Sequence, residues 1–512
     1  MRTYLALLGA GLSLALAPPA AAQTPAQTTA EAPRTREQVF AALDEQFAAF
    51  QRGQHVPGLV WGVVQDGRLV HVGSFGTLEP NSARQVTADS LFRIASMSKA
   101  FTALAILKLR DEGRLRLDDL AEQYVPEMRG WRYPTADSPR IRIRDLLAHA
   151  SGFVTDDPWG DRQQVLSEAD FTRILQGGVP FTRAPQLQME YSNFGYALLG
   201  RIVTNVSGRP FKDFIEQTIM RPLGMASTGY EIADSPLERR AIGYRWENET
   251  WLREPDMRHG TFGAMGGVQT SANDYARWIA FLLSAWPARD DPETGPVRRS
   301  TVREMGQGLN FPAIATRPSS GGQQCPMVTA YGMGLIAMQD CNFRQMLSHS
   351  GGYPGYGSFM LLLPEHNSGL FAFSSRTYTA PSRQVMEAAQ ELLRAGLLPT
   401  RTEPVSPALA ASYRAAGAAY QAGTIEPIRG QLAMNFLLDR SPENWGRVLS
   451  EVRQQVGACR TDGPLTPSGA LNGSFEWTCE RGRLGGQVLL APTSPPTIQA
   501  LRFRPMPNVP AQ

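Results

Sequence analysis

The chain has 512 residues, 19% of them charged, and a formal net charge of +3. This length allows more than one domain and a sizeable core. The near balance of charge and the scattered arginines argue against nucleic acid or an acidic surface as a partner.

The chain opens on a basic residue and a short apolar run. Arg2 precedes the apolar residues 5–17, and three alanines at 20–22 follow two prolines. This order predicts a cleavable signal peptide over residues 1–22, and hence a periplasmic or secreted protein. The alternative is a membrane anchor, but a span needs about 20 apolar residues. We expect no membrane span, and we expect residues 23–35, rich in Pro, Ala and Thr, to be disordered.

Apolar residues in the next segments predict helices and strands of one sheet. Residues 37–51 place apolar side chains on one helical face, and two apolar runs flank the turn signal Asp66-Gly67. Residues 357–375 indicate strand, turn and strand, and residues 381–396 indicate a helix. Between them, residues 90–280 are mostly helical. We therefore predict an α/β (α+β) fold, in which an antiparallel sheet is flanked by N- and C-terminal helices and carries an inserted helical subdomain.

Prolines separate this region from the end of the chain. We predict a linker over residues 398–404, which contain Pro399 and Pro404. Beyond it we expect a second α+β domain, 405–512, of unknown role. Its predicted elements are helices near 406–420 and 432–456 and strands near 470–479, 484–491 and 498–504.

Four cysteines, Cys325, Cys341, Cys459 and Cys479, permit disulfides in an exported protein. Four cysteines allow three pairings, and sequence alone does not choose among them. We favour the local pairs Cys325–Cys341 and Cys459–Cys479. The alternative interpretation is a metal site, but no C-x-x-C motif or closely spaced histidines accompany the cysteines. We expect no metal and no cofactor.

A serine and a lysine stand three residues apart at the start of an apolar helix. Only three lysines occur in the chain, and Lys99 follows Ser96 in SMSKAFTALAIL. Residues i and i+3 share a helical face, so the amine can reach the hydroxyl. A buried lysine can lose its proton near neutrality, whereas arginine cannot. The pair therefore suits a serine nucleophile with a lysine base, and the free N–H groups of the helix start favour developing negative charge. The alternative is a surface pair without chemistry.

Two further motifs follow in order. Tyr191 and Asn193 precede an apolar helical run, where the phenol can act as acid or base and the amide can bond a substrate carbonyl. His349, Gly351 and Gly352 lie before a strand-like run, and glycines there let a substrate approach a backbone N–H. Each motif alone is common by chance.

With these motifs in this order, residues 36–397 resemble the serine β-lactamase and penicillin-binding protein superfamily, on the branch of class C β-lactamases, DD-peptidases and related esterases. The likeness extends to EGRLRLDDLAEQYVPE, IRIRDLLAHASGF, RPLGMASTGY, GAMGGVQTSANDYARW and AYGMGL. It covers this catalytic domain and not residues 405–512.

The resemblance implies a role for each motif residue. Ser96 becomes acylated, Lys99 accepts its proton, and Tyr191 works with Lys99 on the leaving group and the deacylating water. Asn193 orients the substrate. The backbone N–H groups of Ser96 and Gly352 form the oxyanion hole, with Gly351 and His349 on the same strand.

His349 stands where β-lactamases of this branch carry a lysine. A mostly neutral histidine grips a substrate carboxylate less well, which puts efficient β-lactamase activity in doubt. His149, within IRIRDLLAHASGF, is interpreted as structural.

The function predicted from sequence is an exported serine hydrolase that forms an acyl-enzyme on amides or esters: D-amino-acid peptides, small esters or β-lactams. The first alternative is a true class C-type β-lactamase. The alternative of another class is a non-catalytic protein that binds peptides or cell-wall fragments. The expected partner is a small-molecule or peptide substrate, and the sequence leaves the oligomeric state open.

Overall fold

The computed structural model describes residues 34–310, 313–318, 324–401 and 403–507. The predicted signal peptide and all but the last two residues of the segment 23–35 lie outside the described residues. Within the described part, no helix combines the length and the hydropathy that a membrane span requires.

The centre of the larger part is an eight-stranded sheet whose neighbouring strands are all antiparallel. The first of these strands along the chain pairs with the last one, with Leu59 opposite Ser374, so both ends of this region build one sheet. In spatial order the strands are β2 (Arg68–Gly76), β1 (Gly58–Gln65), β12 (Ser368–Ser374), β11 (Tyr356–Leu363), β10 (Met346–Tyr353), β9 (Ile336–Gln339), β8 (Gln324–Tyr331) and β7 (Ala313–Pro318).

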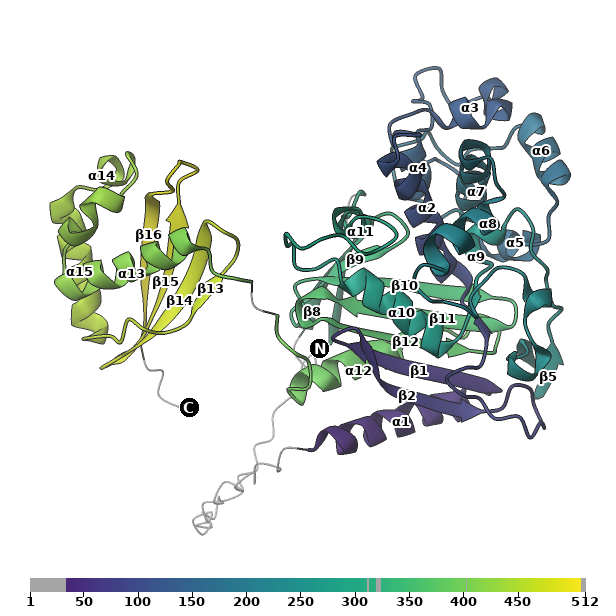
Figure 1. Ribbon diagram of the computed structural model, residues 1–512, viewed down its shortest axis with the longest axis horizontal. Coiled ribbons are helices and arrows are strands. Elements are labelled where there is room, and N and C mark those ends of the chain that lie inside the picture. The colour runs from purple at the N-terminus through teal and green to yellow at the C-terminus, as the bar shows by residue number, and fades with distance from the viewer. Residues whose placement is uncertain (1–33, 311–312, 319–323, 402, 508–512) are drawn as a thin grey trace, which may run out of the picture.

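Helices cover both faces of this sheet, as Figure 1 shows. On one face lie α1 (Arg36–Gly53) and α12 (Ser382–Arg394), and their apolar sides pack with Trp61 and its strand neighbours on that face. On the other face, α10 (Ala272–Leu283) packs on β1, and α2 (Lys99–Asp111) belongs to the same hydrophobic cluster as Val60 and Val64. β1 is buried along its whole length because both faces are covered. The predicted fold class is confirmed.

The inserted subdomain lies between β2 and β7 and is mostly helical. Its core forms one cluster with the α10 face of the sheet. Its helices are α3 (Ala121–Tyr124), α4 (Ile143–Leu147), α5 (Asp157–Gly160), α6 (Glu168–Gly177), α7 (Asn193–Ser207), α8 (Phe211–Ile215), α9 (Gly263–Gly266) and α11 (Arg299–Met305). Its short strand pairs are β3 (Phe92–Arg93) with β6 (Gln269–Thr270), and β4 (Tyr244–Glu247) with β5 (Thr250–Arg253).

The end of the chain forms a four-stranded antiparallel sheet with helices. The helix expected near 432–456 is divided, because Ser441 caps a new helix whose first residue is Pro442, a residue that has no N–H to continue an earlier helix. The first strand was not anticipated. The elements are α13 (Pro407–Ala422), α14 (Phe436–Asp439), α15 (Pro442–Val456), β13 (Leu465–Pro467), β14 (Asn472–Cys479), β15 (Gly482–Leu490) and β16 (Ile498–Pro507).

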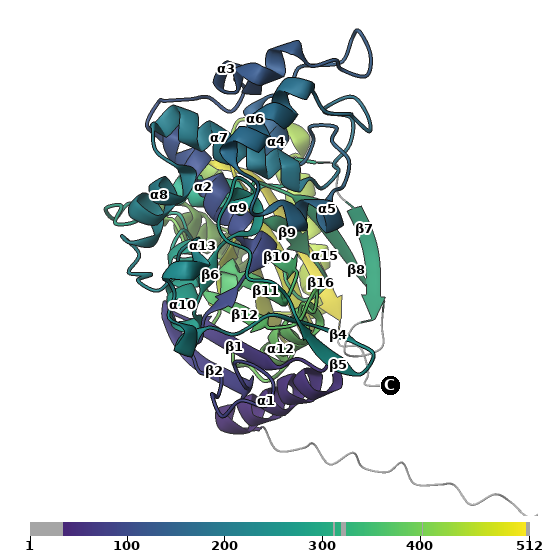
Figure 2. The same cartoon turned by 90° about the vertical axis from the view of Figure 1, so that its right-hand side faces the viewer.

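This C-terminal part has a hydrophobic core of its own, and the residues of that core all lie within 408–503. Figures 1 and 2 show its sheet and helices gathered on one side of the larger part. Among the described residues, no hydrogen bond or ion pair joins residues 406–507 to residues 34–401. We propose that residues 405–512 are a domain that folds independently of the region 36–397.

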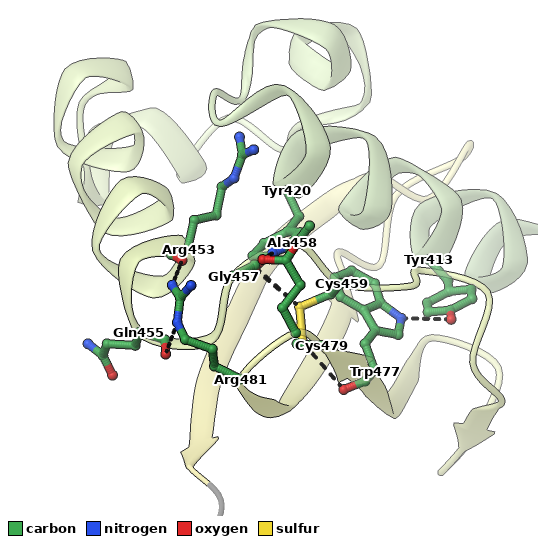
Figure 3. Close-up of a disulfide and its surroundings, with 11 residues drawn as sticks. Tyr413, Tyr420, Arg453, Gln455, Gly457, Ala458, Cys459, Trp477, Cys479 and Arg481 are labelled. Carbon is green, nitrogen blue, oxygen red and sulfur yellow. Dashed lines mark hydrogen bonds between the residues drawn. A yellow bond between two sulfur atoms is a disulfide. The ribbon is translucent and has the colours of Figure 1, made fainter.

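The local cysteine pairing is confirmed. Cys325 bonds Cys341, and Cys459 bonds Cys479. Figure 3 shows the second disulfide joining the end of β14 to the segment after α15, beside Trp477, whose indole N–H donates to the Tyr413 hydroxyl at 2.9 Å.

The domain proposal predicts two independent unfolding units. We expect fragments 23–404 and 405–512, expressed separately, each to unfold cooperatively at the midpoint of the matching transition of the whole chain. Differential scanning calorimetry of the three proteins measures this. A C-terminal fragment without a cooperative transition would contradict the proposal.

The second disulfide closes a loop of 20 residues. A disulfide that closes a loop of this length lowers the entropy of the unfolded chain, which adds about 3 kcal/mol to the free energy of unfolding. We expect the double change Cys459→Ser and Cys479→Ser to lower the stability of the C-terminal unit by this order in urea unfolding. The control, Cys325→Ser with Cys341→Ser, should leave the C-terminal transition unchanged, and an equal effect of the two pairs would contradict the assignment.

Candidate active site

Ser96 lies in a short 3-10 turn, Ala95–Ser98, that runs directly into α2. The residue before it, Ala95, has φ 50°, a left-handed conformation that costs a non-glycine residue about 1–3 kcal/mol. Strand β10 holds this turn in place: a Cβ on Gly351 would lie 2.4 Å from the Ile94 carbonyl oxygen and 3.0 Å from the Ala95 Cβ. Position 351 therefore requires glycine, because any side chain there would clash with the serine turn.

The amine of Lys99 is fully buried beside this serine. Its Nζ donates to Ser96 Oγ at 3.0 Å, to Asn193 Oδ1 at 2.6 Å and to the Met265 carbonyl oxygen at 2.9 Å. Because all three N–H donors of the charged amine are hydrogen-bonded, the position of the amine is fixed. The predicted contact between lysine and serine is present.

Burial lowers the pKa of Lys99 to about 8, because desolvation disfavours the ammonium form. The nearby carboxylates of Asp157, Asp161 and Asp156 oppose this shift. With this pKa, about one molecule in ten carries a neutral amine at pH 7. An arginine at this position would stay charged.

Tyr191 completes the group around Ser96. It precedes α7, whose N-cap is Ser192, and its ring lies with its centroid 4.8 Å from Lys99 Nζ. Burial raises the pKa of Tyr191 well above its usual value, and a hydrogen bond with Ser96 opposes the rise. The phenol therefore keeps its proton unless a reacting group takes it.

Asn193 is buried at the first turn of α7. Its Oδ1 accepts from Lys99, its Nδ2 donates to Asp157 Oδ1 at 2.9 Å, and its backbone N–H donates to Asp156 Oδ1 at 2.6 Å. In this structure the side chain positions the lysine amine. Its expected contact with substrate stays a prediction.

His349 is a neutral member of the site. Its Nδ1 donates to the Ser350 carbonyl oxygen at 2.6 Å, so its Nε2 accepts from the Tyr331 hydroxyl at 2.9 Å. Burial, followed by the charge of Lys99, lowers its pKa to about 3. A histidine with both nitrogens engaged and no charge offers little to a substrate carboxylate.

Strand β10 presents an edge to the site. Among the described residues, β9 pairs with β10 only over Met346–Ser348, which leaves the edge from His349 onward without a strand partner. On the other side, Tyr353 pairs with Tyr356 across a two-residue turn. Because antiparallel pairs alternate, the neighbouring Gly352 is expected to turn its N–H away from β11, toward this edge.

Three carboxylates near the site were not found from the sequence. Asp156 accepts the N–H groups of Asn193 and Phe194, and burial raises its pKa. Burial also raises the pKa of Asp161 to about 7, with the charge of Lys99 opposing. The signal available was the acidic segment DDPWGD that follows IRIRDLLAHASGF.

His149 is placed behind Tyr191, as its structural interpretation expects. Its φ is 57°, its Nδ1 accepts the Ser192 backbone N–H at 3.0 Å, and its ring lies 4.3 Å from that of Tyr191. Burial lowers its pKa well below the usual value. The His149 ring packs against Tyr191 and its Nδ1 fixes the backbone of the next residue.

In the part of the chain that the structure describes, one group of side chains has the spacing of metal ligands: Cys325, Asp340 and Cys341. The two sulfurs are joined in a disulfide, which removes the thiolates that a metal would bind. The group is better explained as a disulfide with a neighbouring carboxylate.

Comparison with known proteins identifies the family of this chain. The family model described as Beta-lactamase matches residues 43–395. The chain belongs to this family. In sequence it is similar to "Protein flp" of Staphylococcus aureus (strain N315), at 29% identity over 329 residues, or 64% of this chain and 60% of that protein. It therefore spans only about 60% of the length of this relative.

Two further likenesses place the chain within the serine β-lactamase and penicillin-binding protein superfamily. It is 26% identical over 344 residues to the D-alanyl-D-alanine-carboxypeptidase/endopeptidase AmpH of Escherichia coli (strain K12), covering 65% of this chain and 83% of AmpH. The solved octameric penicillin-binding protein homologue from Pyrococcus abyssi covers 88% of this chain with a TM-score of 0.58 and 20% identity. That structural likeness shows the fold.

The lowered pKa of Lys99 predicts a pH dependence. If the neutral amine takes the serine proton, kcat/KM for any substrate rises about tenfold per pH unit below pH 8 and levels above it. Steady-state rates from pH 5.5 to 9.5 measure this. A rate that falls as pH rises through 8 would contradict a neutral lysine base.

Proposed function

We propose that this protein is an exported serine hydrolase that forms an acyl-enzyme on ester or amide substrates. The observation that carries the proposal is the 3.0 Å contact between the buried Lys99 amine and Ser96 Oγ, beside the Tyr191 phenol. Membership of the β-lactamase family and the similarity to AmpH support a serine hydrolase of this superfamily.

The proton transfers use Ser96, Lys99 and Tyr191, which lie together in the site. Ser96 Oγ attacks the substrate carbonyl carbon while its proton passes to Lys99 Nζ. The oxygen charge that develops is stabilised by the N–H groups of Ser96 and Gly352. The bond to the leaving group then breaks, and Tyr191 supplies the proton that the leaving group takes up, regaining one from Lys99. Water, activated by the same pair, releases the acyl group and restores Ser96.

The charges around the site favour substrates without a carboxylate near the reacting bond. Lys99 is committed to three protein acceptors, and His349 is neutral with both nitrogens bonded. β-Lactams and D-alanyl peptides both carry a carboxylate. We therefore rank neutral esters and amides first, D-amino-acid peptides second and β-lactams last.

Export rests on two observations. The first 22 residues have the order of a signal peptide. Both disulfides suit an oxidising compartment.

The catalytic pair predicts a specific pattern among variants. Ser96→Ala should abolish labelling by a fluorophosphonate probe, and Lys99→Arg should slow it by about 10²–10⁴-fold because arginine cannot accept the proton. Lys108→Arg is the matched control, since Lys108 lies on the same helix and bonds Pro296 and Glu112 at the surface. Wild-type labelling rates in Lys99→Arg would refute the lysine base.

The substrate ranking predicts p-nitrophenyl acetate turnover with kcat/KM at least tenfold above that for nitrocefin, because Lys99 is committed to three protein acceptors and His349 is neutral. Both are measured by absorbance on the mature protein. Faster nitrocefin turnover would favour the true β-lactamase. Binding of cell-wall fragments with no turnover of any ester, peptide or β-lactam would favour the non-catalytic alternative.

A further inference from the structure

Tyr378 covers the position on β10 where the proposed oxyanion donor lies. It belongs to the loop after β12, and a Cβ on Gly352 would lie 2.8 Å from Tyr378 Cδ1. The Tyr378 backbone N–H lies within hydrogen-bond range of two carbonyl oxygens of the β10–β11 hairpin, Tyr356 at 3.2 Å and Tyr353 at 3.4 Å. Successive Cβ atoms of a strand point to opposite faces, and that of Gly351 faces the serine turn, so the ring meets Gly352 from the other face of β10.

The loop holds Tyr378 in a conformation that is costly for a bulky residue. Its φ is 54°, in the left-handed region, at a cost of about 1–3 kcal/mol. Hydrogen bonds on either side fix the loop: Gly355 N–H donates to Thr377 Oγ1 at 2.8 Å, and Ser374 Oγ donates to the Thr379 carbonyl oxygen at 2.5 Å. Such strain persists only where the surroundings determine it, and it clusters at functional positions.

The Tyr378 hydroxyl reaches the opposite wall of the site. It donates to Asp161 Oδ2 at 2.9 Å, and Asp161, in the turn after α5, is almost fully buried in the helical subdomain. Tyr378 is itself 48% exposed. The hydrogen bond thus joins the sheet to the inserted subdomain near the Tyr353 end of β10.

The two ends of this edge serve different halves of the substrate, given the proposed function. Tyr191 must reach the leaving group, and its ring lies 6.3 Å from that of His349, at the start of the open edge. The acyl group then extends the other way, past Gly352 toward Tyr378.

We propose that Tyr378, held by Asp161, is a specificity-determining residue that restricts the enzyme to substrates with short acyl groups. The proposal rests on the acyl-enzyme function above. The acyl end of the open edge is crossed by an aromatic ring that is fixed at its backbone on the β10–β11 hairpin and at its hydroxyl on Asp161. The class of substrate is an ester or amide of a small acid, acetyl to butyryl in size, with a larger alcohol or amine.

The test is the acyl-length preference of Tyr378→Gly. Glycine removes the ring and tolerates φ 54°, so folding should be unharmed. The ratio of kcat/KM for p-nitrophenyl hexanoate to that for the acetate should rise at least tenfold over wild type, with the acetate rate within threefold. Tyr378→Phe keeps the ring and loses the bond to Asp161, so its ratio should rise less, by about threefold. Leu438→Ala, an exposed change in the C-terminal part, is the control and should leave the ratio unchanged.

The outcomes separate the two proposals. Equal hydrolysis by wild type and Ser96→Ala would overturn the acyl-enzyme function, and this inference with it. Hydrolysis that depends on Ser96, with an unchanged ratio in Tyr378→Gly, would overturn the inference alone. If Tyr378→Gly fails to fold, Tyr378→Asn, which also tolerates a left-handed backbone, replaces it under the same criterion.

Discussion

A lysine amine buried against a serine hydroxyl is the interaction on which the rest of this site depends. Taking an ammonium group out of water is costly, and the protein offsets the cost with three acceptors and three neighbouring carboxylates. The balance leaves the amine with a pKa of about 8. Without that burial, Lys99 would be an ordinary surface cation and Ser96 an unreactive alcohol.

The fold supplies this environment from segments far apart in the chain. The serine turn and α2 carry the pair, the start of α7 carries Tyr191 and Asn193, and α9 contributes the Met265 carbonyl oxygen. Strand β10 closes the other side, where Gly351 leaves room for the strained serine turn. Each contact orients the amine or the strand, so substitution of a supporting residue is expected to act through Lys99.

Much of this could be predicted from the sequence because it is periodic or local. Alternating and helical apolar patterns indicated α1, the β1–β2 hairpin and α12, and short loops favoured the disulfide pairs. The motif residues were found by their order along the chain. Ser96 and Lys99 could be paired on physical grounds, since three residues of helix bring them together.

What could not be predicted arises from tertiary contact. Nothing local to Tyr331 shows that its hydroxyl meets His349, or that Tyr378 reaches Asp161 across 217 residues. The acidic segment near 156–161 looks like an ordinary polar loop until α7 is placed beside it. The divided helix before residue 442 was missed because a composition that favours helix outweighed the Ser-Pro start signal.

The pKa of Lys99 itself tests the central claim most directly. With only three lysines in the chain, NMR of protein carrying ¹³C at lysine Cε gives a spectrum in which Lys99→Arg assigns the signal. The account predicts that Lys99 titrates near pH 8, well below Lys212, whose pKa is raised by its ion pair with Asp213. A Lys99 signal that remains that of a charged amine up to pH 10 would contradict it.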